Sequence, residues 1–557
     1  MASFAGLERC SEVVKGHAAA SLVKSFLDGL PQDVRDERVN AMLDQAAAQL
    51  RAGFAQSPLS LAAVRALAQR PMALGIGRFS IQGMGPSIAL IVDAGTAGAE
   101  IDAVIDQLIE ARPLPTRVKT GTRAGIACRL VEGDQMPTLI ATHDNGVFVL
   151  TNSEGYLREI ISTRRGDKPS IAAGAVLGAQ RARLLEAPLV EVFANVAPLL
   201  PMLEPLLPYE ASDFGRALGV ESVGGAYFAA GPSGLGTVET VDVALLGAED
   251  GLLKAALSGQ VDFGAARFFG KDTLAFAALR IDANAAVTAF DRFCDQLPRE
   301  QARDARRDAA RDFLRGFRMA GFEDHEVTGL LQAIDGSVAV GVQLDDSTAG
   351  IPEGLAVAKL RDAAVVSKQL ARMRELMGEQ GAAWKLRQNG NVDVYDCSAP
   401  IAGAGGPQLS PSYAIVDGYL LVGSSTRAVV SALKVFAESA ETLASEADYV
   451  AAALADEGAM AFVHLRPGRM CETQWKLVET WILPQIDANE MEIGFSSEDL
   501  PESEAIAKAL GTITISLTCD AQGLRLRTRG NVGLGGAAAS FLALVDEVLQ
   551  RAIRKAN

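Results

Sequence analysis

The sequence has few of the residues on which most catalytic and metal sites depend. Its four histidines, His17, His143, His325 and His464, do not occur at the spacings of metalloprotease or other metal motifs. Its six cysteines are far apart in the sequence and form no C-x-x-C pair, which argues against a zinc site or a thioredoxin-like site. From these absences we predict no catalytic residue, no cofactor and no metal.

Basic clusters, long apolar runs and aromatic residues are also scarce. The net charge is −16 and aromatic residues make up 6% of the chain. This composition disfavours nucleic acid and anionic membranes as partners, because both select clustered Lys and Arg. No run reaches the ~18 apolar residues of a membrane-spanning helix, and the N-terminus has no secretory signal pattern. A chain of 557 residues is too long for one core and predicts a few domains.

Three short patterns resemble known motifs but fail on their context. The glycine-rich stretch that begins at Gly533 matches G-x-G-x-x-A, yet it lacks the following strand and acidic residue of a dinucleotide site. Ser233 lies in a G-x-S-x-G-like stretch without its last glycine, and Asp487 starts a calcium-like loop with Glu492 at the glycine position. We interpret all three as structural turns or loops.

Carboxylate clusters keep an enzyme open as an alternative. Asp324 and His325 stand between Glu323 and Glu326, a set that offers metal ligands but is more typical of an acidic helix start. The pair Asp345-Asp346 is a second cluster of this kind. Paired carboxylates perform acid and base catalysis when they converge in a cleft.

What the sequence does contain is a repeated structural module. Residues 87–161 predict a strand, a helix with apolar residues every three or four positions, a second strand, a hairpin at Asn145-Gly146 and a final helix. The same order returns in residues 354–433, with a hairpin at Asp417-Gly418. Register kept over so many residues is not expected by chance, and it indicates an internal repeat.

The repeat extends over the whole chain and predicts two tandem homologous halves, residues 1–265 and 266–557. We expect an α+β fold in which each half has mixed, mainly antiparallel sheets covered by helices, with a pseudo-twofold relation between the halves. The clear strand at 274–280 has only a charged counterpart at 7–13, so the first half is expected to lack part of its beginning. Cys128 and Cys397 fall at similar places, either as thiols that approach each other or as two small core residues.

One helix has a marked charge pattern. Arginines recur every four residues from Arg299 to Arg315, with Asp304, Asp308 and Asp312 each three residues before an arginine. This spacing predicts a solvated helix with i,i+3 ion pairs and an apolar face on the core. Docking on an anionic partner is the alternative.

The order of elements also resembles that of a known family. The likeness rests on Leu218-Gly219-Val220-Glu221 before the Tyr227 hairpin, on Asp250-Gly251-Leu252-Leu253, on residues 272–282 and on the hairpin of residues 412–424. These segments resemble an uncharacterised domain-of-unknown-function family of large exported bacterial proteins, over most of the chain. The resemblance implies an extracytoplasmic setting, in the periplasm or the cell envelope, and no catalytic residues. The absence of a signal pattern makes the cytoplasm the alternative.

Together these observations favour a non-catalytic exported binding or scaffold protein, with a groove or interface between duplicated halves. Its partner would be a protein, a peptide or a lipid. The alternatives are a hydrolase-type enzyme with a carboxylate-based site and a structural component of an envelope assembly. A long apolar groove without carboxylates favours the binder, whereas carboxylates that converge in a deep cleft favour the enzyme.

Overall fold

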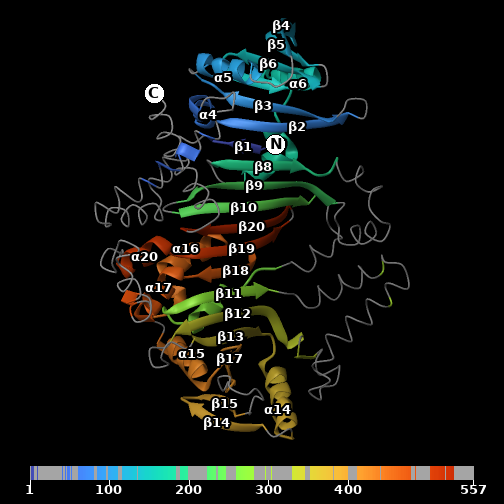
Figure 1. Cartoon of the computed structure of the whole chain (residues 1–557). Helices are drawn as coiled ribbons and strands as arrows, with labels where there is room; N and C mark the ends of the chain where they lie inside the picture. The colour runs from blue at the N-terminus through green and yellow to red at the C-terminus, as the bar shows by residue number, and fades with distance from the viewer. Residues whose placement is uncertain are drawn as a thin grey trace.

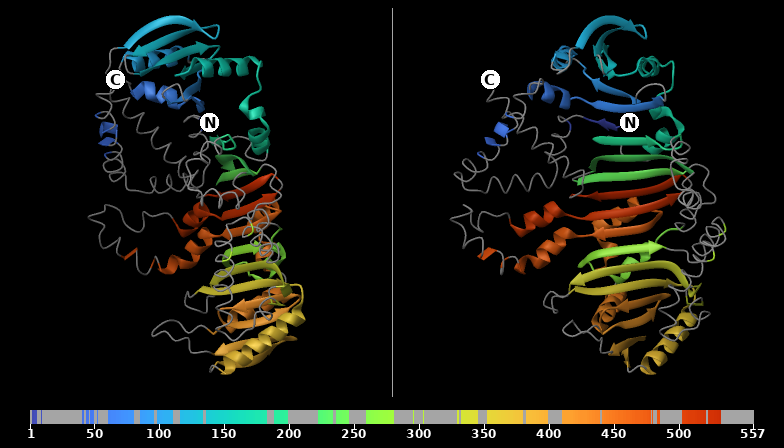
Figure 2. Two further views of the ribbon diagram at one scale, coloured as in Figure 1. Left: turned by 90° about the vertical axis from the view of Figure 1, so that its right-hand side faces the viewer. Right: turned by 45° about the vertical axis from the view of Figure 1, so that its right-hand side comes forward.

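The computed structural model is built on one sheet of 20 strands that runs along the whole length of the molecule (Figures 1 and 2). The α+β class with mainly antiparallel pairing is confirmed, although one continuous sheet replaces the separate sheets that the sequence predicted. The structure describes residues 2–5, 61–80, 85–95, 98–110, 116–133, 136–182, 188–198, 222–233, 236–245, 259–280, 332–344, 352–379, 382–398, 410–438, 441–477, 502–520 and 522–531, and isolated positions elsewhere.

All ladders between the described strands are antiparallel. From one edge of the sheet to the other, the strands are β4 (Thr116–Arg123), β5 (Ile126–Gly133), β6 (Met136–Asp144), β7 (Val147–Thr151), β3 (Gly85–Asp93), β2 (Met72–Ser80), β1 (Ala2–Phe4), β8 (Val190–Asn195), β9 (Val223–Ser233), β10 (Gly236–Leu245), β20 (Gly523–Gly530), β19 (Ile513–Asp520), β18 (Ala459–Leu465), β11 (Thr273–Arg280), β12 (Ile334–Leu344), β13 (Pro352–Leu360), β17 (Tyr419–Gly423), β16 (Ser412–Val416), β15 (Val392–Ser398) and β14 (Ala383–Asn389).

Strands can be matched by counting inward from each edge of the sheet, so that β1 is matched with β11. Matched strands pair with their neighbours in the same register. Ala2 on β1 pairs with Leu74 on β2 and with Val192 on β8. Ala277 on β11 pairs in the same way with Val340 on β12 and with Val463 on β18. The two sets of strands meet at the β10–β20 ladder in the middle of the sheet.

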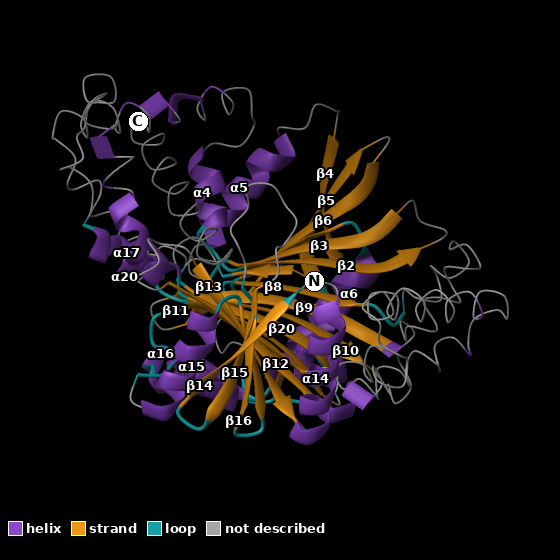
Figure 3. Ribbon diagram, turned by 90° about the horizontal axis from the view of Figure 1, so that it is seen from below, coloured by secondary structure: helices purple, strands orange, loops and turns teal. Residues whose placement is uncertain are grey.

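Helices cover the two faces of the sheet unequally. On one side, here called the core face, lie α6 (Glu154–Arg165), η2 (Ile171–Ala173), α7 (Ala175–Ala182), η5 (Phe263–Phe268), α15 (Thr426–Glu438), η7 (Leu443–Ser445) and α16 (Ala447–Ala455). The other side, the groove face, carries α5 (Gly98–Glu110) with α4 (Leu61–Ala68) near one edge, and α14 (Ala363–Glu379) near the other. Helices α14 and α15 lie on opposite sides of the strands in Figure 3. Helix α17 (Pro467–Leu477) packs on α20 (Ser503–Leu510).

The two predicted hairpins form at their expected turns. Asn145 and Gly146 both adopt positive φ, 45° and 79°, and Asp417 and Gly418 do the same, at 48° and 75°. Two consecutive positive φ values match the right-handed twist of the flanking strands, which is why Asn-Gly and Asp-Gly favour this turn. The helix predicted after the first hairpin is also present as α6, which Ser153 caps at its start.

The largest core lies on the core face, under α15, α16 and η5. It contains Phe268, Phe269, Phe276 and Phe462, all fully buried, and the rings pack edge to face, as between Phe269 and Phe276 at 5.2 Å. Rings in this geometry stabilise a core beyond the apolar area that they bury.

Several sequence predictions need correction or fall outside this description. The strand in the place that corresponds to β11 is β1, at residues 2–4, whereas the sequence pointed to residues 7–13. Of residues 7–13, only Arg9 is described. Cys128 and Cys397 form no disulfide and lie on β5 and β15, next to opposite edges of the sheet, so the two thiols do not approach each other (Figure 1). The Arg299–Arg315 helix and the glycine-rich stretch at Gly533 lie almost wholly outside the described residues.

Candidate functional site

The candidate site is an apolar groove on the groove face, built around three valines of β12. Side chains alternate between the two faces of a strand, so Val338, Val340 and Val342 all point to the same side. Their side chains remain 37%, 48% and 38% exposed. They form a valine ridge that stands above the sheet.

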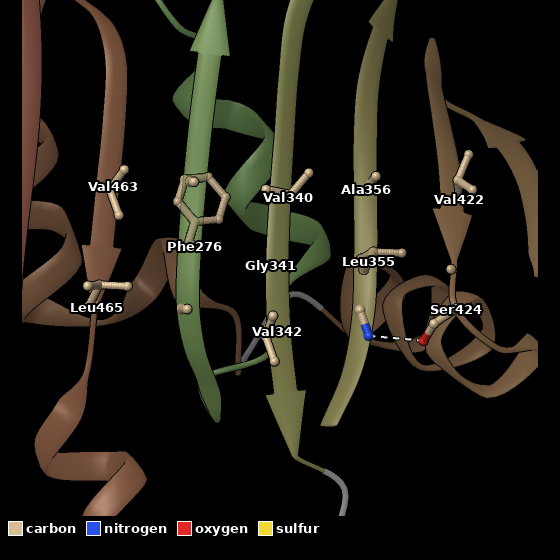
Figure 4. A pocket seen from close by; sticks show the side chains of 14 residues that line it. Phe276, Val340, Gly341, Val342, Leu355, Ala356, Val422, Ser424, Val463 and Leu465 are labelled. Carbon is tan, nitrogen blue, oxygen red and sulfur yellow. Dashed lines mark hydrogen bonds between the residues drawn. The ribbon is translucent and has the colours of Figure 1, made fainter. Parts of the chain in front are cut away.

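Small residues on both neighbouring strands turn this ridge into a groove. Val340 and Val342 are flanked by Ala277 and Ala275 on β11, and by Ala356 and Gly354 on β13. The small residues on each side of the ridge form two troughs. Larger side chains stand beyond the troughs, namely Val463 and Leu465 on β18 and Val422 on β17 (Figure 4). This open groove has a volume of about 460 Å³, within the usual range of small-molecule sites.

The groove offers hydrocarbon surface and almost nothing else. None of its lining residues is charged. The hydroxyl of Ser424 accepts a hydrogen bond from the backbone N–H of Gly354 at 3.0 Å, so it is already engaged (Figure 4). Each of the five lining strands also has a ladder neighbour on both sides, which uses the backbone groups. The groove therefore suits an apolar ligand.

The apolar surface continues across the groove face into the other set of strands. Exposed aliphatic side chains occur on β10 and β20, at Val241 and Leu526, and on β2, β3 and β8. The residues on these last three strands are Leu74, Ile76, Ile88 and Val192. Exposed apolar side chains that extend over several neighbouring strands are typical of an interaction site.

Charged residues gather instead on the core face, where the two sets of strands meet. Asp242 on β10 is fully buried, and its carboxylate accepts hydrogen bonds from Arg525 Nε at 3.1 Å and from Gln180 Nε2 at 3.0 Å. Asp456 accepts from Arg527 at 3.4 Å and from Arg529 at 2.5 Å. Burial, and then repulsion from Arg529, lower the pKa of the Arg527 guanidinium. Each carboxylate here is neutralised by arginine, so this cluster stabilises the junction and contains no free base.

A second ion pair on the core face joins the exposed Arg181 to the buried Glu191. Arg181 donates two hydrogen bonds to Glu191, at 2.8 and 2.6 Å, and the Tyr227 hydroxyl donates to the same carboxylate. Burial and the hydrogen bond to Glu191 raise the pKa of the Tyr227 phenol. A phenol held protonated is a poor base, and the arrangement is structural.

A third polar group contains Asp262, Tyr419 and Lys359. Tyr419 donates to Asp262 at 2.5 Å, and Lys359 Nζ lies 3.2 Å from the same carboxylate. Burial opposes ionisation of Asp262, but the hydrogen bonds from Tyr419, from the Gly264 N–H and from Lys359 hold its pKa below the usual range. Burial and this pairing raise the pKa of Tyr419 to about 12. The group fastens the start of η5 to the sheet.

The histidines in the described part of the chain also have structural partners. His143 Nδ1 lies 3.1 Å from Asp102 on α5, so the residue ties a helix to β6 as well as preceding the hairpin turn. His464 is buried on β18 with Nε2 3.5 Å from Asp448, a distance too long for a good hydrogen bond. Burial opposes ionisation of Asp448, yet His464 and Arg466 together lower its pKa.

The structure does not test the carboxylates that the enzyme alternative invoked. Asp324, His325, Asp345 and Asp346 lie outside the described residues. Within the described part of the chain, no group of three or more His, Cys, Asp or Glu side chains is placed to hold a metal. Among the same residues, no helix combines the length and the apolar character needed to cross a membrane.

The groove itself was missed by sequence reasoning, although a signal was present. Strands β11, β12 and β13 are apolar at almost every position and not only at every second one, which is typical of strands buried on both faces. That pattern predicts a second apolar face but does not reveal where it stays uncovered.

Comparison with protein-family models, with curated proteins and with solved structures found no match. The resemblance to a family of exported bacterial proteins therefore stays a prediction.

Proposed function

We propose that this protein is a non-catalytic binding or scaffold protein made of two duplicated halves, and that a hydrocarbon chain lies in its groove. The observation that carries the proposal is the uncharged, concave surface around the valine ridge. An extracytoplasmic location, as the family resemblance implies, belongs to the same proposal and is tested by fractionation of cells that produce the protein.

The order and register of the strands support the duplication. Each strand from β1 to β10 has a counterpart from β11 to β20 at the same distance from its own edge of the sheet. In the middle of the sheet, Val238 pairs with Arg529 and Asp242 pairs with Arg525. Because Val238 corresponds to Arg525 and Asp242 to Arg529, exchanging the two strands leaves the pairing of the β10–β20 ladder unchanged. Such a self-complementary ladder is what a twofold relation between the halves requires.

The packing of Val261 and Ala265 supports an earlier boundary between the proposed halves than residue 265. Both residues pack in the core with residues of β11, β13 and α15. Under this proposal the second half begins near Gly259, whereas the sequence predicts a boundary at 265.

The shape of the groove favours a chain-like ligand. The two troughs run parallel to the strands, over Ala275 and Ala277 and over Gly354 and Ala356, with the valine ridge between them. Ser424 has the only polar side chain among the lining residues, and its hydroxyl accepts a hydrogen bond from the Gly354 N–H. An acyl chain fits these conditions, because its burial is driven by apolar area alone.

Titration with a fluorescent fatty acid tests this proposal. Saturable binding is expected for the unmodified protein, and the substitution Gly354→Val is expected to weaken it. A Cβ added at Gly354 meets no atom within 4 Å, so valine fills the trough without disturbing the sheet. Excluding two methylene groups, at about 0.8 kcal/mol each, weakens binding by roughly tenfold.

A matched pair of charge substitutions provides the control. Val340→Glu places a carboxylate in the groove and should abolish binding, whereas Val118→Glu acts on an equally exposed valine of edge strand β4, outside the groove. Equal binding by all variants, or no saturable binding by the unmodified protein, would contradict the proposed ligand class.

A further inference from the structure

The core face of the first half contains an open recess. In the second half, the corresponding position is occupied by a segment of the chain itself. The recess has a volume of about 310 Å³ and opens between β1, β2, β3 and β8. Its lining is mainly apolar, with Asp93 exposed at its rim and Glu191 buried in its wall. Its remaining lining residues are Phe4, Ala5, Pro71, Met72, Ala73, Ile91, Pro188 and Leu189.

The corresponding place in the second half is occupied by residues 259–268. By the register of the ladders, Pro71 corresponds to Ser337, and Asp93 corresponds to Lys359. Ser337 Oγ accepts a hydrogen bond from the backbone N–H of Asp262 at 2.9 Å, and Lys359 Nζ lies 3.2 Å from the Asp262 carboxylate. Thus the counterparts of Pro71 and Asp93, two residues that line the recess, bind the start of η5 in the other half.

Strand β18 makes further contacts with the same segment. The carbonyl of Ala459 accepts from the Val261 N–H at 2.8 Å, and the ring of Phe462 meets that of Phe263 edge to face at 5.0 Å. The corresponding residues of β8 are Pro188 and Glu191, and both line the recess. Four residues that contact residues 259–268 in one half therefore have counterparts that line an open recess in the other.

One residue of the recess has the opposite charge to its counterpart in the second half. Lys359 attracts the carboxylate of Asp262, whereas the corresponding Asp93 would repel it. Only one interaction of the Asp93 carboxylate is seen among the described residues, a hydrogen bond from the Gly95 N–H at 3.2 Å. An occupant of the recess must therefore carry Lys or Arg where residues 259–268 carry Asp262.

Glu191 does not impose a second charge requirement. Arg181 and Tyr227 already bind its carboxylate, so its charge is compensated within the wall of the recess. An apolar or aromatic side chain is acceptable in the place of Phe263.

We propose that the recess binds a peptide segment of another polypeptide that follows the pattern of residues 259–268, with a basic residue in place of Asp262. Its backbone N–H at the Val261 position donates to the Pro188 carbonyl. Its basic side chain pairs with Asp93, and its apolar side chains cover Ala73 and Ile91. This site is separate from the groove, which lies on the opposite face, and it does not depend on the acyl-chain proposal.

Two synthetic peptides test the charge rule on the full-length protein. One has the sequence of residues 259–270, and the other differs from it only by Asp262→Lys. Fluorescence anisotropy of the labelled peptides should show that the lysine peptide binds at least about tenfold more tightly. In the protein variant Asp93→Lys, the preference should reverse in favour of the aspartate peptide.

The control variant is Asp167→Lys, which makes the same charge change at an exposed position after α6, outside the recess. It should leave the preference for the lysine peptide unchanged. Failure of both peptides to bind, equal binding of the two, or the same response to Asp167→Lys as to Asp93→Lys would overturn the proposal. Binding of the fluorescent fatty acid should be unaffected by Asp93→Lys, so the two proposals fail or stand separately.

Discussion

Removal of the Asp242 carboxylate should weaken the junction between the two sets of strands more than any single surface change. Asp242 is fully buried, and the side chain of Arg525, 283 residues away in the sequence, is only 14% exposed. The substitution Asp242→Ala leaves a largely buried guanidinium without this carboxylate, close to Arg527, whose pKa burial and neighbouring arginines already lower. Breaking a buried pair by removing one partner costs about 3–5 kcal/mol.

Hydrogen exchange of the two central strands measures this cost locally. At about 1.4 kcal/mol per factor of ten, amides in residues 236–245 and 523–530 should exchange roughly a hundred to three thousand times faster in Asp242→Ala. Exchange in β4 and β14, at the two edges of the sheet, should not change.

Two further variants separate the buried charge from the loss of the side chain. Changing both Asp242 and Arg525 to valine removes the pair and leaves β-branched residues that suit a strand, so exchange should return to within about tenfold of the unmodified rate. Glu132→Ala breaks an exposed pair with Lys119 and should cost less than ~1 kcal/mol. If Asp242→Ala accelerated exchange less than tenfold, the pair would not hold the junction.

Smaller predictions concern the two hairpin turns and Tyr419. Gly418→Ala should cost about 1–2 kcal/mol because φ is 75° there. Gly146→Ala should cost more, since its Cβ would also approach the Gly95 carbonyl oxygen at 3.2 Å; the reverse order in urea unfolding would contradict this. Burial and Asp262 raise the pKa of Tyr419 to about 12, so its contribution to stability is complete below pH ~10 and is lost as the pH rises through 12. Tyr419→Phe should reduce the alkaline loss of stability, and an unchanged pH dependence of unfolding would count against this assignment.

Local features of the fold could be predicted because their causes are local. Asn145-Gly146 and Asp417-Gly418 tolerate positive φ, and this property alone determines where the two hairpins turn. Ser153 and Gly166 begin and end α6 in the same direct way. The same two turns are also the basis on which the sequence predicts an internal repeat.

Alignment by sequence pattern was less reliable where side chains are interchangeable. The sequence pattern aligns Cys128 with Cys397, but the ladders align Arg129 with Tyr395 and thus shift Cys397 by three residues relative to Cys128. Apolar strand residues of similar size carry little information about register, which the hydrogen bonds of the sheet define.

The sequence by itself determined the α+β class, the hairpins and the absence of the common catalytic motifs, because these depend on residue type and short-range spacing. Tertiary structure decided that one sheet joins all 20 strands, that Asp242 meets Arg525, and that valines of β12 stand over small residues of β11 and β13. It also decided that residues of the 259–268 segment pack in the core beside β11 and β13, while the recess beside Asp93 stays open. All of these depend on which distant strands pair and in which register, and strand pairing between distant segments leaves no mark at any single position of the chain.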